Sequence, residues 1–269
     1  MEPAVAEKLI QLNLEFYKNV AKEFSASRQY FQPGWQQFWK KISLGKSKLA
    51  ISANLKIFDL GCGNGRFLDF LQKHLVKFQY LGIDGNLELL KIARQRFLQN
   101  GPQQVKDISF LQKNIFVYKN WLPVVHQKYG NFDVIVCFAV LHHIPGYQNR
   151  FLQLQNLAEL LNPKGFLIFS LWNFIGETHL REHIIPWKDS GLQISKKQLE
   201  SHDFLLTWGN DLKNLRYCHN FAESEIAKLI EQLTKKTLHA DRKGLKLIHY
   251  FRADGRNGDL NHYLVFQVN

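Results

Sequence analysis

Three glycines at alternate positions stand where an apolar stretch of the chain ends, in the segment 56–68 (KIFDLGCGNGRFL). Asp59 precedes Gly61, Gly63 and Gly65, and an apolar helical pattern resumes after the last glycine. Glycine tolerates positive φ and lets a ligand approach bare backbone, and the N-terminus of a helix offers free N–H groups. No Lys-Ser/Thr follows Gly65, which excludes a P-loop, and the spacing differs from Gly-x-Gly-x-x-Gly. The segment predicts a ligand-binding turn between a strand and a helix, the alternative being a tight turn without a ligand.

Two polar residues at the ends of later apolar runs extend this site. Asp84 closes the run YLGID, and a carboxylate at the end of a second strand can accept hydrogen bonds from both ribose hydroxyls. The alternative is a helix N-cap, which is common after a strand. Asn114 closes the run ISFLQKN, and its amide oxygen can accept a hydrogen bond.

The order Asp-x-Gly-x-Gly-x-Gly resembles the first motif of the class I S-adenosylmethionine (SAM) methyltransferases. The resemblance implies that Asp59, the three glycines and Asp84 bind SAM, whose ammonium and sulfonium groups suit an acid. It also implies that Asn114 meets the adenine amino group, at a position where the family usually has Asp. Many members carry an N-terminal lid, for which Tyr17, Phe24, Arg28 and Tyr30 are the expected wall residues, or else aromatic residues that pack the lid on the sheet.

Apolar runs and helical patterns alternate from residue 56 to residue 171, which predicts a mostly parallel sheet with helices on both faces. Two runs at 246–253 and 262–267 predict a final antiparallel pair. The expected fold is therefore α/β, Rossmann-like and of the class I methyltransferase type. We expect a helical lid over 1–45 and a SAM-binding domain over 46–269. Within that domain, a segment at about 173–215 without regular alternation is a candidate for substrate recognition.

The composition indicates an anionic partner. The chain has 269 residues, with 35 Lys and Arg against 23 Asp and Glu, and a formal charge of +12. Such an excess favours a polyanion, although a generally basic proteome would produce it too. Neither a signal peptide nor a long apolar run is visible, so we expect a cytoplasmic protein without a membrane span.

Histidines provide candidates for the chemistry of the site. His142 and His143 follow the apolar run 132–137, and many class I methyltransferases resemble the chain there. His143 is the candidate for contact with the acceptor, because histidine is the usual general base; the alternative is a histidine bonded to the backbone. His179 and His183 have a metal-ligand spacing, but no third ligand is apparent, so no metal is expected.

The segment 215–221 (LRYCHNF), before the start of a Glu-rich helix, is similar to the methyltransferases that esterify 5-carboxymethyluridine at the tRNA wobble position. The resemblance covers about residues 13–267 and implies tRNA as a partner. It also suggests a small zinc-binding activator protein, with which the eukaryotic members work. Arg216 offers a planar fork for a carboxylate, and Tyr217 and His219 are expected to bond to or stack on the uracil. The alternative for Arg216 is a surface ion pair.

Three functions follow for the chain. The favoured one is methylation of a tRNA wobble uridine at its carboxymethyl group. The second is a small-molecule O- or N-methyltransferase, because the fold does not fix the acceptor. The third is a SAM-binding scaffold without catalysis, which the intact glycine loop and Asp84 disfavour.

Overall fold

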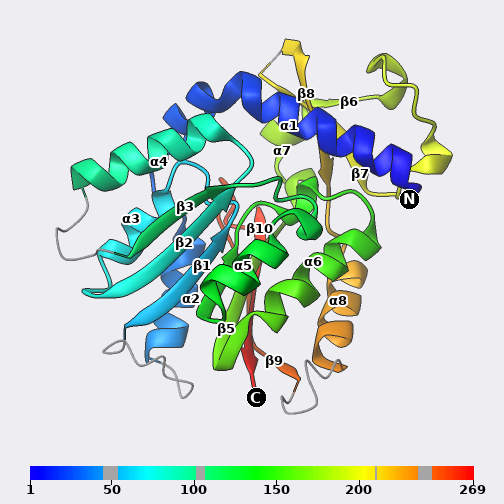
Figure 1. The fold of residues 1–269 in the computed structure, drawn as a ribbon. Helices are drawn as coiled ribbons and strands as arrows, with labels where there is room; N and C mark the ends of the chain where they lie inside the picture. Colours follow the sequence, from blue (N-terminus) through cyan, green and yellow to red (C-terminus); the bar gives the residue numbers. More distant parts are fainter. Residues whose placement is uncertain (45–53, 101–106, 210, 236–243) are drawn as a thin grey trace.

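The computed structural model describes residues 1–44, 54–100, 107–209, 211–235 and 244–269. A seven-stranded sheet forms its centre, in the order β3-β2-β1-β4-β5-β10-β9 (Figure 1). The first five strands run parallel, and β10 pairs antiparallel with both β5 and β9. The strands are β1 (Leu55–Leu60), β2 (Phe78–Asp84), β3 (Ile108–Gln112), β4 (Phe132–Cys137), β5 (Leu161–Trp172), β9 (Leu245–Ala253) and β10 (Asn261–Val268).

Helices cover both faces of this sheet. α2 (Pro33–Leu44), α3 (Arg66–Gln72) and α4 (Leu87–Asn100) pack on one face. α5 (Leu122–Tyr129), α6 (Tyr147–Glu159) and α8 (Glu223–Lys235) pack on the other. The strands are buried on both sides, as expected for parallel strands between helices. The predicted α/β fold with its C-terminal antiparallel pair is confirmed.

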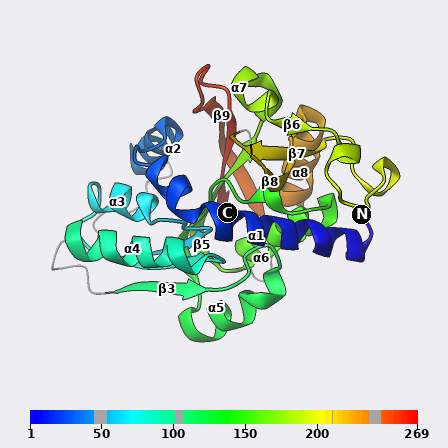
Figure 2. The same cartoon turned by 90° about the horizontal axis from the view of Figure 1, so that it is seen from above.

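The helix α1 (Pro3–Ala26) lies across the carboxyl ends of the strands, as the view from above shows (Figure 2). Pro3 opens the helix, and Val5, Leu9, Phe16 and Val20 are buried along one face at helical spacing. The predicted lid of residues 1–45 therefore has two parts with different positions. Only α1 and the loop after it cover the edge of the sheet, whereas the buried side of α2 packs on its face.

A second, three-stranded antiparallel sheet follows β5, in the order β6-β7-β8. Its strands are β6 (Ile184–Ile185), β7 (Asp203–Trp208) and β8 (Asp211–His219), preceded by α7 (Thr178–Arg181). Leu205 and Tyr217 of this sheet pack with Val5 and Leu9 of α1. The segment at about 173–215, whose sequence has no regular alternation, thus contributes to a cap with α1, and the cap extends past residue 215 to the end of β8. No helix in the described ranges is long and apolar enough to cross a membrane.

Candidate active site

The glycine loop joins β1 to α3, and its three glycines have different roles. All three have positive φ, at 84° for Gly61, 53° for Gly63 and 80° for Gly65. A Cβ on Gly61 would lie 2.2 Å from Val140, and one on Gly65 would lie 3.0 Å from Ala93. A Cβ on Gly63 would have no atom within 4 Å. Gly61 and Gly65 therefore permit close packing, whereas Gly63 borders open space.

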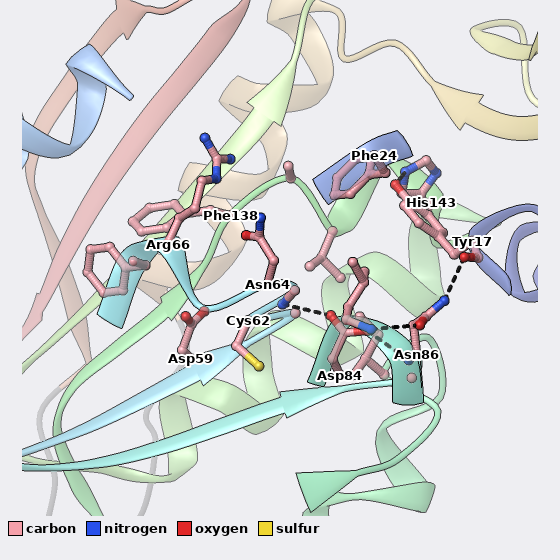
Figure 3. Close-up of a pocket in the computed structure, with 18 of the residues that line it drawn as sticks. Tyr17, Phe24, Asp59, Cys62, Asn64, Arg66, Asp84, Asn86, Phe138 and His143 are labelled. Atoms are coloured by element: carbon pink, nitrogen blue, oxygen red, sulfur yellow. Dashed lines mark hydrogen bonds between the residues drawn. The ribbon is translucent and has the colours of Figure 1, made fainter. Parts of the chain in front are cut away.

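That open space is a cavity of about 570 Å³ at the carboxyl ends of β1, β2 and β4 (Figure 3). Its volume suits a ligand the size of a nucleoside derivative. Among the predicted residues, the cavity is lined by Tyr17, Phe24, Asp59, Gly61, Gly63, Asp84 and His143. Gly65, Arg28 and Asn114 do not line it, and Gly65 acts instead through its packing against Ala93.

Two buried carboxyl groups, those of Asp59 and Asp84, line the cavity. Asp84 accepts hydrogen bonds from the backbone N–H groups of Gly63 at 2.9 Å and Asn86 at 2.8 Å. Asp59 accepts one from the Tyr80 hydroxyl at 2.7 Å. Burial raises the pKa of Asp59 to about 7 and that of Asp84 to about 6, because the charged form loses its hydration. Neither carboxyl has a cation beside it in the described structure.

These features fit SAM. Two buried carboxyl groups without a cation suit a ligand with an ammonium and a sulfonium, whose charge would offset the cost of ionising them. Leu89, Ile115 and Phe116 provide an apolar wall for a base, next to Asp84, which retains lone pairs for ribose hydroxyls. The bare backbone at Gly63 leaves room for close approach of the ligand. The cavity thus has the charge, the size and the apolar surface that the cofactor requires.

Asn114 differs from the prediction. Its side-chain oxygen accepts a hydrogen bond from the Phe116 N–H at 3.0 Å, which closes a local turn. Asn114 borders a separate shallow hollow, next to Gln112 and Gly85. The expected contact with adenine does not fit this position, and Gln112, Ile115 and Phe116 line the cavity instead.

At the other end of the cavity, Tyr17 of α1 meets His143. The Tyr17 hydroxyl and His143 Nε2 lie 2.8 Å apart, and His143 Nδ1 lies 2.9 Å from the carbonyl oxygen of Tyr217. A carbonyl only accepts, so Nδ1 carries the proton and Nε2 accepts from the tyrosine hydroxyl. Burial, aided by the nearby Arg216, lowers the pKa of His143 to about 3. His143 therefore stays neutral and fixes the position of Tyr17.

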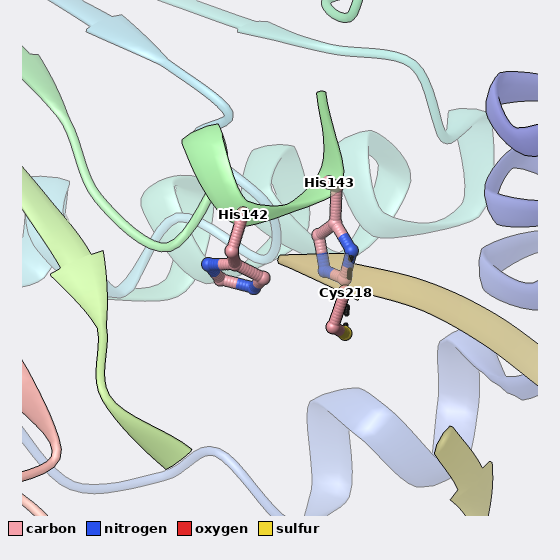
Figure 4. A group of neighbouring side chains, drawn as sticks. All are labelled: His142, His143 and Cys218. Atoms are coloured by element: carbon pink, nitrogen blue, oxygen red, sulfur yellow. Dashed lines mark hydrogen bonds between the residues drawn. The ribbon is translucent and has the colours of Figure 1, made fainter. Parts of the chain in front are cut away.

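His142, His143 and Cys218 lie side by side beneath this contact, with ligand atoms within 4.8 Å of one another (Figure 4). His142 stacks on Trp172 at 4.2 Å, and its Nδ1 has no hydrogen-bond partner. Both ring nitrogens of His143 are already bonded, and the Arg216 guanidinium lies close enough to affect both histidines. A nearby positive charge disfavours a metal ion, so we interpret the group as packing behind Tyr17.

Arg216 lies beside the same end of the cavity, in an aromatic cage. Its guanidinium carbon is 5.2 Å from the ring centre of Phe16, 5.3 Å from that of Trp172 and 5.6 Å from that of Trp208. The side chain is 4% exposed, its Nε has no hydrogen-bond partner, and it has no ion-pair partner among the described residues. The alternative of a surface ion pair is thereby excluded. A buried cation of this kind is costly without an anion, which makes it a candidate anion site.

Arg28 occupies the neighbouring position at the end of α1. Its guanidinium carbon lies 5.2 Å from the ring centre of Phe24, which is itself 6.0 Å from that of Trp208. Burial and the charge of Arg216 lower the pKa of Arg28. Arg28, expected to bind the cofactor, thus packs on Phe24, which lies next to the Trp208 that contacts Arg216. Arg28 does not line the cofactor cavity.

Tyr217 and His219 point away from the cavity, which corrects their predicted contact with the acceptor. The Tyr217 hydroxyl donates to Asp203 at 2.7 Å, and His219 lies 2.8 Å from Asp203 and 2.7 Å from Glu225. Arg150 completes this buried network through Glu200 and Glu225. The network joins β7, β8, α6 and α8. Although burial lowers the pKa of His219, the hydrogen bonds to Asp203 and Glu225 raise it above its ordinary value. Both side chains are therefore structural.

Two residues that sequence reasoning missed connect the predicted ones. The buried Asn13 donates to the carbonyl oxygens of His143 and Tyr217, each at 3.2 Å, and accepts from the Tyr217 N–H at 2.8 Å. Asn86 donates to the Tyr17 carbonyl oxygen at 2.6 Å while its N–H bonds Asp84 (Figure 3). For Asn13, the signal in the sequence was a polar residue within the apolar stripe of α1. For Asn86, the signal was the Asp-x-Asn turn that begins at Asp84.

Comparisons with known proteins find similarity to methyltransferases. Residues 58–167 match the family model described as a methyltransferase domain. The chain is 24% identical over 229 residues to the tRNA (carboxymethyluridine(34)-5-O)-methyltransferase of Schizosaccharomyces pombe, covering 81% of this chain and 85% of that one. It is 26% identical over 158 residues to the ubiquinone biosynthesis O-methyltransferase of Escherichia coli O9:H4, covering 57% of this chain and 59% of the relative's length.

Solved structures show the same fold. A SAM-dependent methyltransferase from Clostridium acetobutylicum aligns with a TM-score of 0.60 and 14% identity, covering 95% of this chain and 98% of that one. One from Methanosarcina mazei aligns with a TM-score of 0.53 and 18% identity, covering 80% and 92%. Residues 58–167 thus match a methyltransferase domain, and the described structure has the fold of solved SAM-dependent methyltransferases.

Proposed function

We propose that the chain methylates a carboxylate, and that this carboxylate is the carboxymethyl group of a 5-carboxymethyluridine at the wobble position of tRNA. The caged Arg216 is the observation that carries the proposal. Its planar fork suits a carboxylate, and Phe16, Trp172 and Trp208 occupy its other surfaces. An acceptor carboxylate beside it would supply the counter-charge that the described structure lacks.

The state of His143 supports the same choice. A hydroxyl acceptor must lose its proton, and a useful general base has a pKa near the working pH. His143 has a pKa of about 3, and its Nε2 already accepts a hydrogen bond from Tyr17. A carboxylate is ionised at neutral pH and needs no general base. It therefore suits a site in which the nearest histidine, His143, is a poor general base.

The remaining chemistry is positioning. Bound SAM supplies an activated methyl group. Asp59 and Asp84 would hold the cofactor, Arg216 would hold the acceptor, and α1 would exclude water from the space between them. Alignment of two bound reactants is itself a large part of such catalysis. Tyr17, fixed by His143, lies at the junction of the two sites.

Support for tRNA as the acceptor molecule comes from two further facts. The matched region of the S. pombe tRNA methyltransferase covers most of both chains. The net charge of +12 would favour a polyanion, in keeping with the electrostatic part of nucleic-acid binding. A small activator protein is a second proposed partner, on the basis of the resemblance alone.

A small-molecule O-methyltransferase is the second candidate. The match to the E. coli ubiquinone biosynthesis enzyme favours it, over 57% of this chain. Its acceptor would be a hydroxyl, and this candidate therefore requires a base that Tyr17 and His143, bonded to each other, do not offer.

The test uses purified protein, methyl-labelled SAM and three acceptors. These are a synthetic anticodon stem–loop with 5-carboxymethyluridine, the same stem–loop with uridine, and a catechol. We expect label only in the first, as an ester that mild alkali removes. Alkali-stable label on the catechol, with none on the stem–loop, would replace this proposal with the second candidate.

A further inference from the structure

Tyr30 has the most exposed large apolar or aromatic side chain in the described part of the chain, at 86%. It lies in the loop between α1 and α2 and does not line the cofactor cavity. Its neighbour Phe31 packs against Phe70 at 5.6 Å, so the loop itself is anchored in the sheet's helical layer. An aromatic ring held out into solvent from an anchored loop is unusual for a residue with only a packing role.

The backbone beneath Tyr30 is fixed by residues of the glycine loop and α3. Asn64 donates to the Arg28 carbonyl oxygen at 3.3 Å and to the Ser25 hydroxyl at 3.0 Å. Arg66 donates to the carbonyl oxygen of Tyr30 itself at 2.6 Å. Both Asn64 and Arg66 also line the cavity (Figure 3). The position of Tyr30 is therefore coupled to the cofactor site, while its ring is left free.

Two arginines accompany the backbone of this loop: Arg28 precedes Tyr30 by two residues, and Arg66 bonds the Tyr30 carbonyl oxygen. Arg28 and Arg66 have no ion-pair partner among the described residues, whereas the nearby Arg96 is paired with Asp69. Burial and the charges of Arg28 and Arg96 lower the pKa of Arg66 to about 10. Like charges at such proximity destabilise each other until an anion lies between them. The surroundings of Tyr30 thus suit a phosphate as well as a flat ring.

We propose that Tyr30, with Arg28 and Arg66, forms a subsite for a nucleotide that adjoins the acceptor nucleotide, its base stacked on Tyr30 and its phosphate held by the two arginines. Unpaired bases in RNA loops are commonly stacked on exposed aromatic side chains. The subsite rests on the proposed function, because it assumes an RNA acceptor. It would place the acceptor base at the cavity by holding the neighbouring nucleotide outside.

The experiment compares Tyr30→Ala with Tyr30→Phe, using the modified anticodon stem–loop and the free 5-carboxymethyluridine nucleoside as acceptors. Loss of one stacked base should raise the KM of Tyr30→Ala for the stem–loop roughly tenfold. Tyr30→Phe keeps the ring and should match the unchanged protein. The affinity for SAM and the activity on the nucleoside should not change in either variant. Val76→Ala, which alters another highly exposed side chain, is the matched control.

The outcomes separate this inference from the proposed function. If the unchanged protein methylates the stem–loop and Tyr30→Ala has the same KM, the subsite is wrong and the proposed function stands. If Tyr30→Ala loses the nucleoside activity equally, Tyr30 serves the acceptor itself and the assignment to a neighbouring nucleotide is overturned. If the unchanged protein methylates neither acceptor, the proposed function fails first, and the subsite with it.

Discussion

Asp59 and Asp84 combine deep burial with the absence of a cation, and this makes the cofactor site sensitive to pH. A cationic ligand requires both carboxyl groups in their ionised form. Their pKa values of about 7 and about 6 place this ionisation close to neutral pH. In the protein without ligand, the raised values also favour the folded state at low pH. That contribution to stability is lost as the pH rises through the folded-state values.

We therefore predict that the affinity for SAM rises between pH 5.5 and pH 8, by up to roughly tenfold per pH unit between the pKa values of Asp84 and Asp59 and more steeply below that of Asp84. Isothermal titration calorimetry across this range measures it, and proton release on binding should appear below pH 7. Asp59→Asn keeps an acceptor for the Tyr80 hydroxyl and should remove the upper part of the pH dependence. An affinity for SAM that does not change over this range would show that neither carboxyl meets the cation.

Residue types and spacing selected Asp59, Gly61, Gly63 and Asp84, which line one cavity for a local reason. The glycine loop and Asp84 are set by neighbours in the chain and by the ends of parallel strands, which one sequence displays. Asn114, expected to meet the adenine amino group, closes a local turn through its side chain, and the sequence does not decide between a turn and a ligand contact.

β8 shows why the acceptor end was only partly predictable. Successive side chains of a strand point to opposite faces. Arg216 therefore faces the aromatic cage, whereas Tyr217 and His219 face Asp203. The motif at 215–221 was visible in the sequence. The strand that pairs with it, β7, was not visible, so the two faces of β8 could not be told apart. β6 has only two residues, too few to form a pattern in the sequence.

α1 is fixed to β8 and to the His143 segment mainly through Asn13. Its amide makes three buried hydrogen bonds to the backbone of His143 and Tyr217. We predict that Asn13→Ala lowers the free energy of unfolding by about 2–4 kcal/mol, since each unsatisfied buried group is costly. Urea denaturation measures it.

Gln11→Ala on the exposed side of the same helix is the control and should change this free energy by less than about 0.5 kcal/mol. Asn13→Ala should also speed proteolysis within α1, because the helix would detach more often. Equal stability of the two variants would mean that apolar packing alone holds α1.

At the scale of the whole molecule, the basic charge should determine how tRNA binds. The logarithm of the affinity for tRNA should fall linearly with the logarithm of the salt concentration, because bound Lys and Arg release counterions from phosphates. The exposed Lys188, Lys196 and Lys197 lie in the cap formed with α1. We predict that their joint replacement by Glu weakens tRNA binding and flattens this dependence, while the affinity for SAM is unchanged.

A matched control changes the same charge at the opposite edge of the sheet. Lys77, Lys128 and Lys164 are exposed and lie close to the amino-terminal ends of β2, β4 and β5. Their joint replacement by Glu should weaken tRNA binding much less. Filter binding over a salt series compares the two triple variants. Equal losses of tRNA affinity would mean that tRNA binding depends on net charge and does not involve the cap.

The central claim is that a caged arginine holds an acceptor carboxylate, and single-turnover rates of two variants test it most directly. Arg216→Lys keeps the charge but loses the planar fork, and His143→Gln keeps a polar side chain but removes the base. On the stem–loop with 5-carboxymethyluridine, we predict a fall of roughly 100-fold or more for Arg216→Lys and a much smaller one for His143→Gln, with SAM affinity unchanged in both. An essential His143 together with a dispensable Arg216 would contradict the account, because it would require an acceptor that must be deprotonated.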